Sequence, residues 1–386
     1  MLDRSGSMKK SARRTGISLI LVILIALPPL LNGCASLNTA SEHDNEEIFW
    51  PPAPFEARIR WVKSIHNRHD AGIEKGFWRK VVEFVTGKET EGISKPYGIY
   101  ADAKDRLFVA DAGRGVVHEF DIKGKEYSLV GHDTMRVFKA PIAIAGDDED
   151  NLYITDSAAG TVYRYAIGKK KLVQFITRKL VHPTGIAYHA SNKLLYITDT
   201  ANHQVVVFDM QARERFRIGK RGESSGQFNF PTDLFIDQAG DLYVTDALNS
   251  RIQVFSSDGR FLRMFGSAGD TTGYFSKPKG VAVDSEGHIY VSDALQDSVQ
   301  IFDKTGALML EFGTKGSGAG QFWMPSGLFI DSFDNIYVGD AYNQRIQIFK
   351  YLKSKEEKAT QKSRNSSGIE NEQLSANKQG ENRVLP

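Results

Sequence analysis

Short apolar runs recur along most of the chain and are separated by turn residues. Six of these runs end in an aspartate, with spacings of 45, 43, 47, 47 and 47 residues: Asp111, Asp156, Asp199, Asp246, Asp293 and Asp340. A proline stands fifteen or sixteen residues before each aspartate, and an apolar residue stands three positions before each proline. Because the apolar residue, the proline and the aspartate recur together at nearly constant offsets, the chain contains six copies of one structural unit.

Each unit is predicted to contain four short strands. In the fifth unit these are residues 278–283, 289–291, 298–302 and 308–312, with turn residues between them. The second strand is apolar at consecutive positions in every unit, as at 242–244 and 336–338, which indicates burial on both faces. Four-stranded sheets buried on both faces, with a period above forty residues, are typical of the blades of a propeller. We therefore predict an all-β, six-bladed β-propeller.

The fourth unit has a family resemblance. Its segments Pro-Thr-Asp-Leu-Phe-Ile-Asp, Asp-Leu-Tyr-Val-Thr-Asp-Ala and Asn-Ser-Arg-Ile-Gln-Val-Phe, within 231–255, resemble the NHL repeat, and 325–349 matches equally well. The resemblance covers about 93–350, and it is weakest at 141–166. It implies a six-bladed propeller of the NHL type and says little about function.

Ring closure and one insertion follow from the ends of the repeat. The sixth unit lacks its own outer strand, and 58–65 alternates as an outer strand should, so we predict that this N-terminal strand completes blade six and that the propeller spans 58–353. The strand order then implies that the chain enters from the bottom face. We call "top" the face that carries the fourth-to-first and second-to-third strand links. An amphipathic helix is expected near 73–86 on the top side, with Phe77 and Trp78 as apolar anchors. It could plug the channel, dock a partner or lie on a membrane.

The N-terminus resembles a bacterial lipoprotein signal peptide. A basic segment, an apolar run and Leu31-Asn32-Gly33-Cys34 follow one another, so residues 1–33 are expected to be removed and Cys34 to be lipidated. The alternative is an uncleaved transmembrane anchor, although Pro28 and Pro29 interrupt a short run. Residues 34–57 would be a linker, and 354–386 a disordered tail. Ala35 follows the cysteine where an aspartate would mark inner-membrane retention in some bacteria, so we predict the outer membrane, facing the periplasm.

Charge and cysteine content exclude several classes. Removing the five basic residues and one acidic residue before Cys34 leaves 44 basic and 46 acidic residues, a balance that does not favour a nucleic-acid partner. Since Cys34 is the single cysteine, the chain has no internal disulfide and no cysteine-based zinc or haem site.

The six repeated aspartates are interpreted as structural, because a ligand rarely needs sixfold repetition. Two of them stand five residues before an arginine, which predicts the ion pairs Asp246–Arg251 and Asp340–Arg345. Residues that vary between units on the top face are better candidates for binding a partner. They are Arg114, Asn202, His203, Asn249, Tyr342 and Asn343.

The propeller axis gives little sign of catalysis. Two residues after each proline, five units have glycine or alanine, and the fourth has Asp233, with Lys279 one blade away. We expect a hub salt bridge between these two, or else a single-carboxylate ion site, with no cofactor and no metal cluster. We therefore predict a non-catalytic envelope lipoprotein, monomeric as a propeller, whose top face binds a protein or peptidoglycan-associated partner. The alternative is a metal-dependent propeller enzyme of the lactonase or lyase kind.

Overall fold

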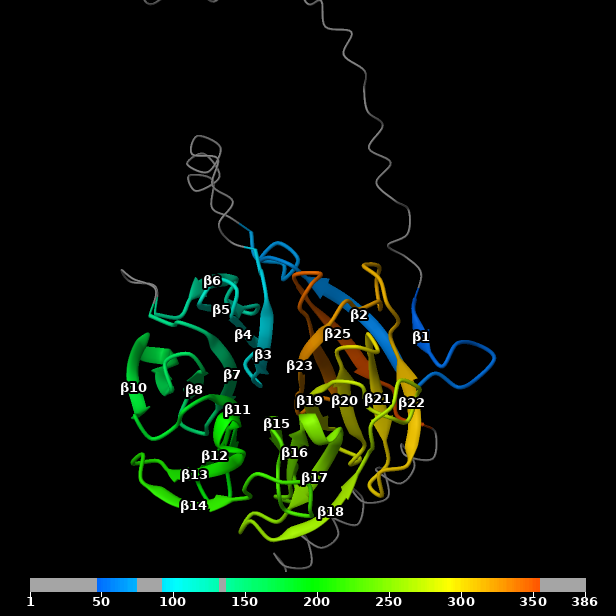
Figure 1. The fold of residues 1–386 in the computed structure, drawn as a ribbon. Coiled ribbons are helices and arrows are strands. Elements are labelled where there is room, and N and C mark those ends of the chain that lie inside the picture. Colours follow the sequence, from blue (N-terminus) through cyan, green and yellow to red (C-terminus); the bar gives the residue numbers. More distant parts are fainter. Residues whose placement is uncertain (1–46, 75–91, 132–136, 355–386) are drawn as a thin grey trace, which may run out of the picture. The chain divides into compact units, whose positions relative to one another are not determined.

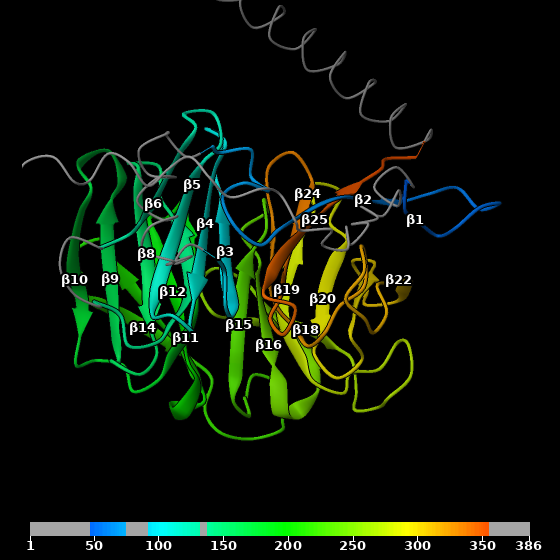
Figure 2. The ribbon, with the colours of Figure 1, turned by 90° about the horizontal axis from the view of Figure 1, so that it is seen from above.

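The computed structural model describes residues 47–74, 92–131 and 137–354 (Figure 1). Six antiparallel sheets stand around a central axis, and the strand that begins at the repeated proline of each unit lies innermost. The side view in Figure 2 shows the strand links gathered at the two faces of the ring. This is the predicted six-bladed β-propeller.

In blades one to five the four strands follow one another in chain order. Blade one contains β3 (Pro96–Ala101), β4 (Arg106–Asp111), β5 (Val116–Asp121) and β6 (Glu126–Leu129). Blade two contains β7 (Pro141–Gly146), β8 (Asn151–Asp156), β9 (Thr161–Ala166) and β10 (Lys171–Thr177). Blade three contains β11 (Pro183–His189), β12 (Leu194–Asp199), β13 (Gln204–Asp209) and β14 (Glu214–Ile218). Blade four contains β15 (Pro231–Ile236), β16 (Leu242–Asp246), β17 (Arg251–Phe255) and β18 (Phe261–Phe265).

Blade five contains β19 (Pro278–Val283), β20 (Ile289–Asp293), β21 (Ser298–Phe302) and β22 (Leu308–Phe312). Blade six contains β23 (Pro325–Ile330), β24 (Asn335–Asp340) and β25 (Arg345–Tyr351), together with β2 (Ile59–Ile65) and β1 (Phe49–Trp50). Within the described ranges, three short 3₁₀ helices lie in links between strands: η1 (Ile167–Lys169), η2 (Thr200–Asn202) and η3 (Ala247–Asn249).

The two ends of the repeat meet in blade six. Strand β2 pairs antiparallel with β25, from Ile59 opposite Tyr351 to Ile65 opposite Ile346. Strand β1 adds a fifth, outermost strand, which the sequence analysis had assigned to the linker. Because β1 runs antiparallel to β2, the chain reverses direction before β2. The described chain therefore begins at the outer edge of blade six. This corrects the expectation, drawn from the strand order alone, that the chain enters the propeller from the bottom face.

The core lies between neighbouring blades. Each of six clusters combines buried side chains of adjacent sheets, and Tyr196, Tyr290 and Phe322 are among the largest that are fully buried. Ile73 is buried with Ile65 and Ile346, so the segment that follows β2 also packs onto the ring. The predicted helix near 73–86, with Phe77 and Trp78, falls mostly outside the described residues, as do Cys34 and the tail.

Small residues at the axis allow the inner strands to approach one another closely. A Cβ atom on Gly327 would lie 1.9 Å from the carbonyl oxygen of Tyr97, and one on Gly98 would lie 2.4 Å from that of Ile142. Both clashes are with the backbone of a neighbouring blade and could not be relieved by a side-chain rotation. The glycines that recur two residues after the prolines are therefore required by the packing of the ring.

Candidate functional site

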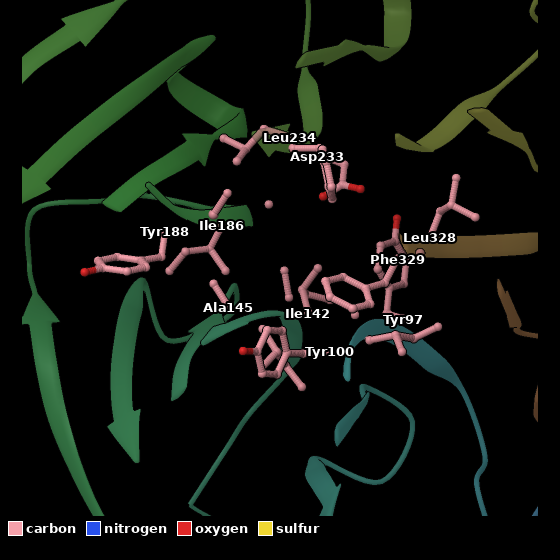
Figure 3. A pocket seen from close by; sticks show the side chains of 18 of the residues that line it. Tyr97, Tyr100, Ile142, Ala145, Ile186, Tyr188, Asp233, Leu234, Leu328 and Phe329 are labelled. Carbon is pink, nitrogen blue, oxygen red and sulfur yellow. The ribbon is translucent and has the colours of Figure 1, made fainter. Parts of the chain in front are cut away.

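A cavity of about 220 Å³ lies at the axis of the propeller. Strands β3, β7, β11, β15 and β23 line it with aliphatic, aromatic and a few polar side chains (Figure 3). Asp233 of β15 is the carboxylate in this lining. In Figure 3 its side chain points inward, and the hydroxyl of Tyr97 from β3 points toward it.

Asp233 is a carboxylate in an unfavourable environment for charge. Burial raises its pKa to about 7, although hydrogen bonds from the backbone N–H groups of Leu234 and Val281 act in the opposite direction. The bond from Val281 N to Oδ2 is 3.3 Å long and joins blade four to blade five. The side chain therefore bridges two inner strands and also faces the cavity.

Tyr97 shares this environment. Burial raises the pKa of its hydroxyl well above the ordinary value, and the nearby charge of Asp233 raises it further. The phenol is therefore neutral at physiological pH and can donate or accept a hydrogen bond.

The expected hub salt bridge is wrong. Asp233 forms no ion pair with the part of the chain that the structure describes, and Lys279 interacts with charges nearer the top face. Burial, and then the neighbouring charges of Lys277 and Lys95, lower the pKa of Lys279, while Asp293 raises it. The two residues are one blade apart in sequence, but Lys279 does not line the cavity that Asp233 faces.

The repeated aspartates hold the top loops in place. All six are fully buried, and each accepts at least one backbone N–H from the loop that leads into the first strand of its own blade. Asp111 is typical: Ser94 N and Lys95 N lie 2.7 and 3.0 Å from its carboxylate oxygens. These repeated side-chain-to-backbone hydrogen bonds show that the six aspartates have a structural role.

Two of the aspartates also bind arginine, at the spacing that the sequence indicated. Arg251 Nε lies 2.8 Å from Asp246 Oδ2, and Arg345 Nε lies 2.8 Å from Asp340 Oδ2. Each guanidinium also donates to backbone carbonyls of the adjacent top loop, such as Gln321 O for Arg345. These arginines are therefore part of the scaffold.

Most of the polar residues proposed for partner binding have structural contacts. The Nδ2 atoms of Asn202, Asn249 and Asn343 donate to the repeated aspartate of their own blade over 2.7 to 2.9 Å. His203 is buried and accepts a hydrogen bond from Phe230 N, while Arg114 donates to Gly92 O. Tyr342 differs, since it is 52% exposed.

The sequence analysis missed an exposed apolar surface on the top face. Among the described residues, fourteen large hydrophobic side chains are exposed, and eight of them lie in top-face links: Val137, Val181, Phe230, Leu248, Tyr274, Leu295, Trp323 and Tyr342. Only two, Phe55 and Phe333, lie in links at the opposite face. We call these eight residues the apolar top surface.

Basic and aromatic groups meet at the edge of this surface. The rings of Trp323 and Tyr342 are 5.5 Å apart, and Lys95 Nζ lies 6.0 Å from the centre of the Tyr342 ring. Lys277 is exposed, and its charge and that of Lys95 both lower the pKa of Lys279. Lys95 and Lys277, each directly before an innermost strand, therefore add positive charge beside the aromatic groups of this face.

Two general features can be stated for residues 47–74, 92–131 and 137–354. No group of three or more His, Cys, Asp and Glu side chains among them could bind a metal ion. Within the same ranges, no helix has the length and apolar character needed to cross a membrane.

Comparison with known families agrees with the fold. Residues 155–268 match the family described as SMP-30/Gluconolactonase/LRE-like region, and residues 283–363 match a family described as 6-bladed beta-propeller. The chain is also 34% identical over 76 residues to NHL repeat-containing protein 2 of Gallus gallus, a match that covers 17% of this chain and only 10% of that protein. These matches confirm the resemblance to NHL-repeat propellers.

Solved structures of similar fold include enzymes. Virginiamycin B lyase from Staphylococcus aureus is 13% identical, with a TM-score of 0.50, and the match covers 67% of this chain and 96% of that one. A gluconolactonase from Xanthomonas campestris, XC5397, is 16% identical, with a TM-score of 0.53 and coverage of 67% and 87%. At these identities the likeness shows the propeller fold and leaves the activity open.

Proposed function

We propose that this NHL-like six-bladed propeller is a non-catalytic scaffold of the bacterial cell envelope that binds a protein partner through its top face. The observation that supports this most is the apolar top surface. Eight exposed large hydrophobic side chains lie in links of one face and two in links of the other, and exposed apolar surface is typical of interaction sites. The loops that present it are fixed by the buried aspartates, so the surface is preorganised.

The composition of the surface favours one partner chemistry. Leu248, Leu295 and the Trp323–Tyr342 pair offer aliphatic and aromatic contacts, and aromatic side chains are enriched at interface hot spots. Lys95 and Lys277 on the same face would attract carboxylates. The partner would therefore present apolar side chains flanked by acidic residues, as an envelope protein or a peptidoglycan-associated protein could.

Charge insertion on each face tests the proposal. Leu295→Glu places a carboxylate in the apolar top surface, and Phe333→Glu does so at a bottom link of similar exposure, 58% against 60%. We expect Leu295→Glu to remove a co-purifying envelope protein that wild type and Phe333→Glu retain, with all three melting alike. Loss in both variants, or in Phe333→Glu only, would contradict top-face binding.

The lipid anchor is part of the same proposal. The sequence before Cys34 resembles a lipoprotein signal peptide, and an acylated cysteine would hold the propeller at the outer membrane on the periplasmic side. Cys34→Ser should release the protein into the soluble fraction with unchanged β-structure by circular dichroism. Membrane retention of that variant would show that another segment anchors the chain.

An enzyme is the second candidate, because the axial cavity and the gluconolactonase-like match favour it. A metal-dependent enzyme would need several oxygen or nitrogen ligands near the axis. The residues that the structure describes do not fit such a metal, since they include no cluster of three metal-binding side chains. Calorimetric titration with calcium and zinc tests this candidate. Heat of stoichiometric metal binding would support the enzyme hypothesis.

A further inference from the structure

The structural role of Asp233 does not require a carboxylate. Its hydrogen bonds within the protein come from the backbone N–H groups of Val281 and Leu234. An asparagine oxygen could accept both without the cost of burying a charge. An aspartate at this position therefore suggests that the charge itself is used.

The carboxylate faces a cavity and lacks a cationic partner among the described side chains. Lys279, the nearest candidate by sequence, interacts with Lys277, Lys95 and Asp293 instead. The side chain is partly exposed within the cavity, and with a pKa of about 7 its carboxyl group is mostly ionised at pH 8. A cation that entered the cavity from outside the chain would therefore meet an unpaired carboxylate.

The cavity is not shaped for a metal ion alone. Below Asp233 and Tyr97, the lining is provided by Tyr100, Phe329 and Leu234, with other aliphatic residues (Figure 3). Tyr100 stands three residues after Tyr97 on β3, which is roughly 10 Å along a strand. The cavity thus has the Asp233 carboxylate at one end and mostly aromatic and aliphatic groups, together with the hydroxyls of Tyr100 and Tyr188, at the other.

We infer that the axial cavity binds a small aliphatic amine. Its ammonium group would donate to the carboxylate of Asp233 and to the hydroxyl oxygen of Tyr97. Its short hydrocarbon chain would lie along the channel toward the rings of Tyr100 and Phe329, whose centres are 5.4 Å apart. A volume of about 220 Å³ accommodates a chain of a few carbon atoms. This site is independent of the partner surface on the top face.

Matched ligands and variants test the inference on the full-length protein in detergent. The probe is n-pentylamine, its neutral control is 1-pentanol, and binding is measured by isothermal titration calorimetry at pH 8. Asp233→Asn removes the charge and keeps an acceptor for Val281 N–H. Asp241→Asn removes another carboxylate of blade four that does not line the cavity.

We expect wild type and Asp241→Asn to bind pentylamine at least tenfold more tightly than pentanol, and Asp233→Asn to lose this preference. Tyr97→Phe should weaken pentylamine binding and leave pentanol unaffected. The inference fails if wild type does not bind pentylamine, if pentanol binds equally well, or if Asp233→Asn keeps the preference. It also fails if calcium binds in an Asp233-dependent manner and pentylamine does not.

Discussion

Asp233 destabilises the empty propeller when it is ionised, because the folded protein cannot replace the hydration that the carboxylate has in the unfolded chain. Its pKa is about 7 in the folded state against 3.8 for an unperturbed aspartate. The titratable group that faces it across the cavity is Tyr97, which is neutral over this range. Between the two pKa values the folded state keeps a proton that the unfolded state has released, so stability falls as the pH rises from about 4 to about 7.

Asp233→Asn should remove this pH dependence. At pH 4 the variant and wild type should unfold at similar denaturant concentrations, whereas at pH 8 the variant should be more stable, by up to about 4 kcal/mol. Urea unfolding at both pH values measures the difference. A variant that is less stable than wild type at pH 8 would show that the ionised carboxylate has a stabilising contact that we have not recognised.

The buried aspartates differ in what they bind, which gives a second prediction at this scale. Asp340 binds Arg345 as well as backbone, whereas Asp156 binds backbone N–H groups of Lys139, Ala140 and Ala159. Asp340→Asn should therefore cost more than Asp156→Asn, by about 1–3 kcal/mol, because it leaves a buried guanidinium without its counter-charge. Equal losses in urea unfolding would mean that the ion pair adds nothing to the backbone bonds.

At the scale of the element, β2 joins the two ends of the ring. Its residue Ile65 is fully buried with Ile346 and Ile73, while Val62 of the same strand is 41% exposed. Ile65→Ala should destabilise the propeller by about 2–5 kcal/mol and Val62→Ala by much less. Urea unfolding with a single transition would measure both. Similar small losses would indicate that β2 contributes little to closure.

The blades could be predicted from the sequence because two kinds of information coincide there. Consecutive apolar positions identify strands that are buried on both faces, and the Pro and Asp marks fix their register from blade to blade. Strand β1 could not be predicted, since Phe49–Trp50 is too short to show a period and is followed by Pro51 and Pro52. Its pairing depends on tertiary contacts of Trp50 with Phe312 and Phe349.

The candidate site was predictable only in part. Asn249 and Asn343 vary between blades and are polar, which favoured recognition, yet each lies three residues after its aspartate and bonds to it. Sequence spacing does not show which way a side chain points, so the hydrogen bond between each asparagine and its aspartate could not be predicted. Leu248 and Leu295 were overlooked because an apolar residue in a short link looks like the end of a strand. Asp233 was identified, but its separation from Lys279 depends on side-chain orientation.

For the molecule as a whole, the two faces of the propeller are unequal. The top-face links carry eight of the fourteen exposed large hydrophobic side chains of the described residues, and these loops are fixed by six buried carboxylates. The net charge of the chain is only +2, so electrostatic attraction of a partner to this face depends on local charges such as Lys95 and should weaken as salt is added. The central claim is that this face contacts a protein in the envelope.

In-cell photo-crosslinking tests that claim most directly. A benzoylphenylalanine residue replaces Leu295 on the top face or Phe333 on the bottom face, two positions of similar exposure. The account predicts that the Leu295 replacement crosslinks to one discrete protein, that the Phe333 replacement does not, and that Trp323→Ala weakens the Leu295 crosslink. Discrete crosslinks from Phe333 with none from Leu295 would contradict the account.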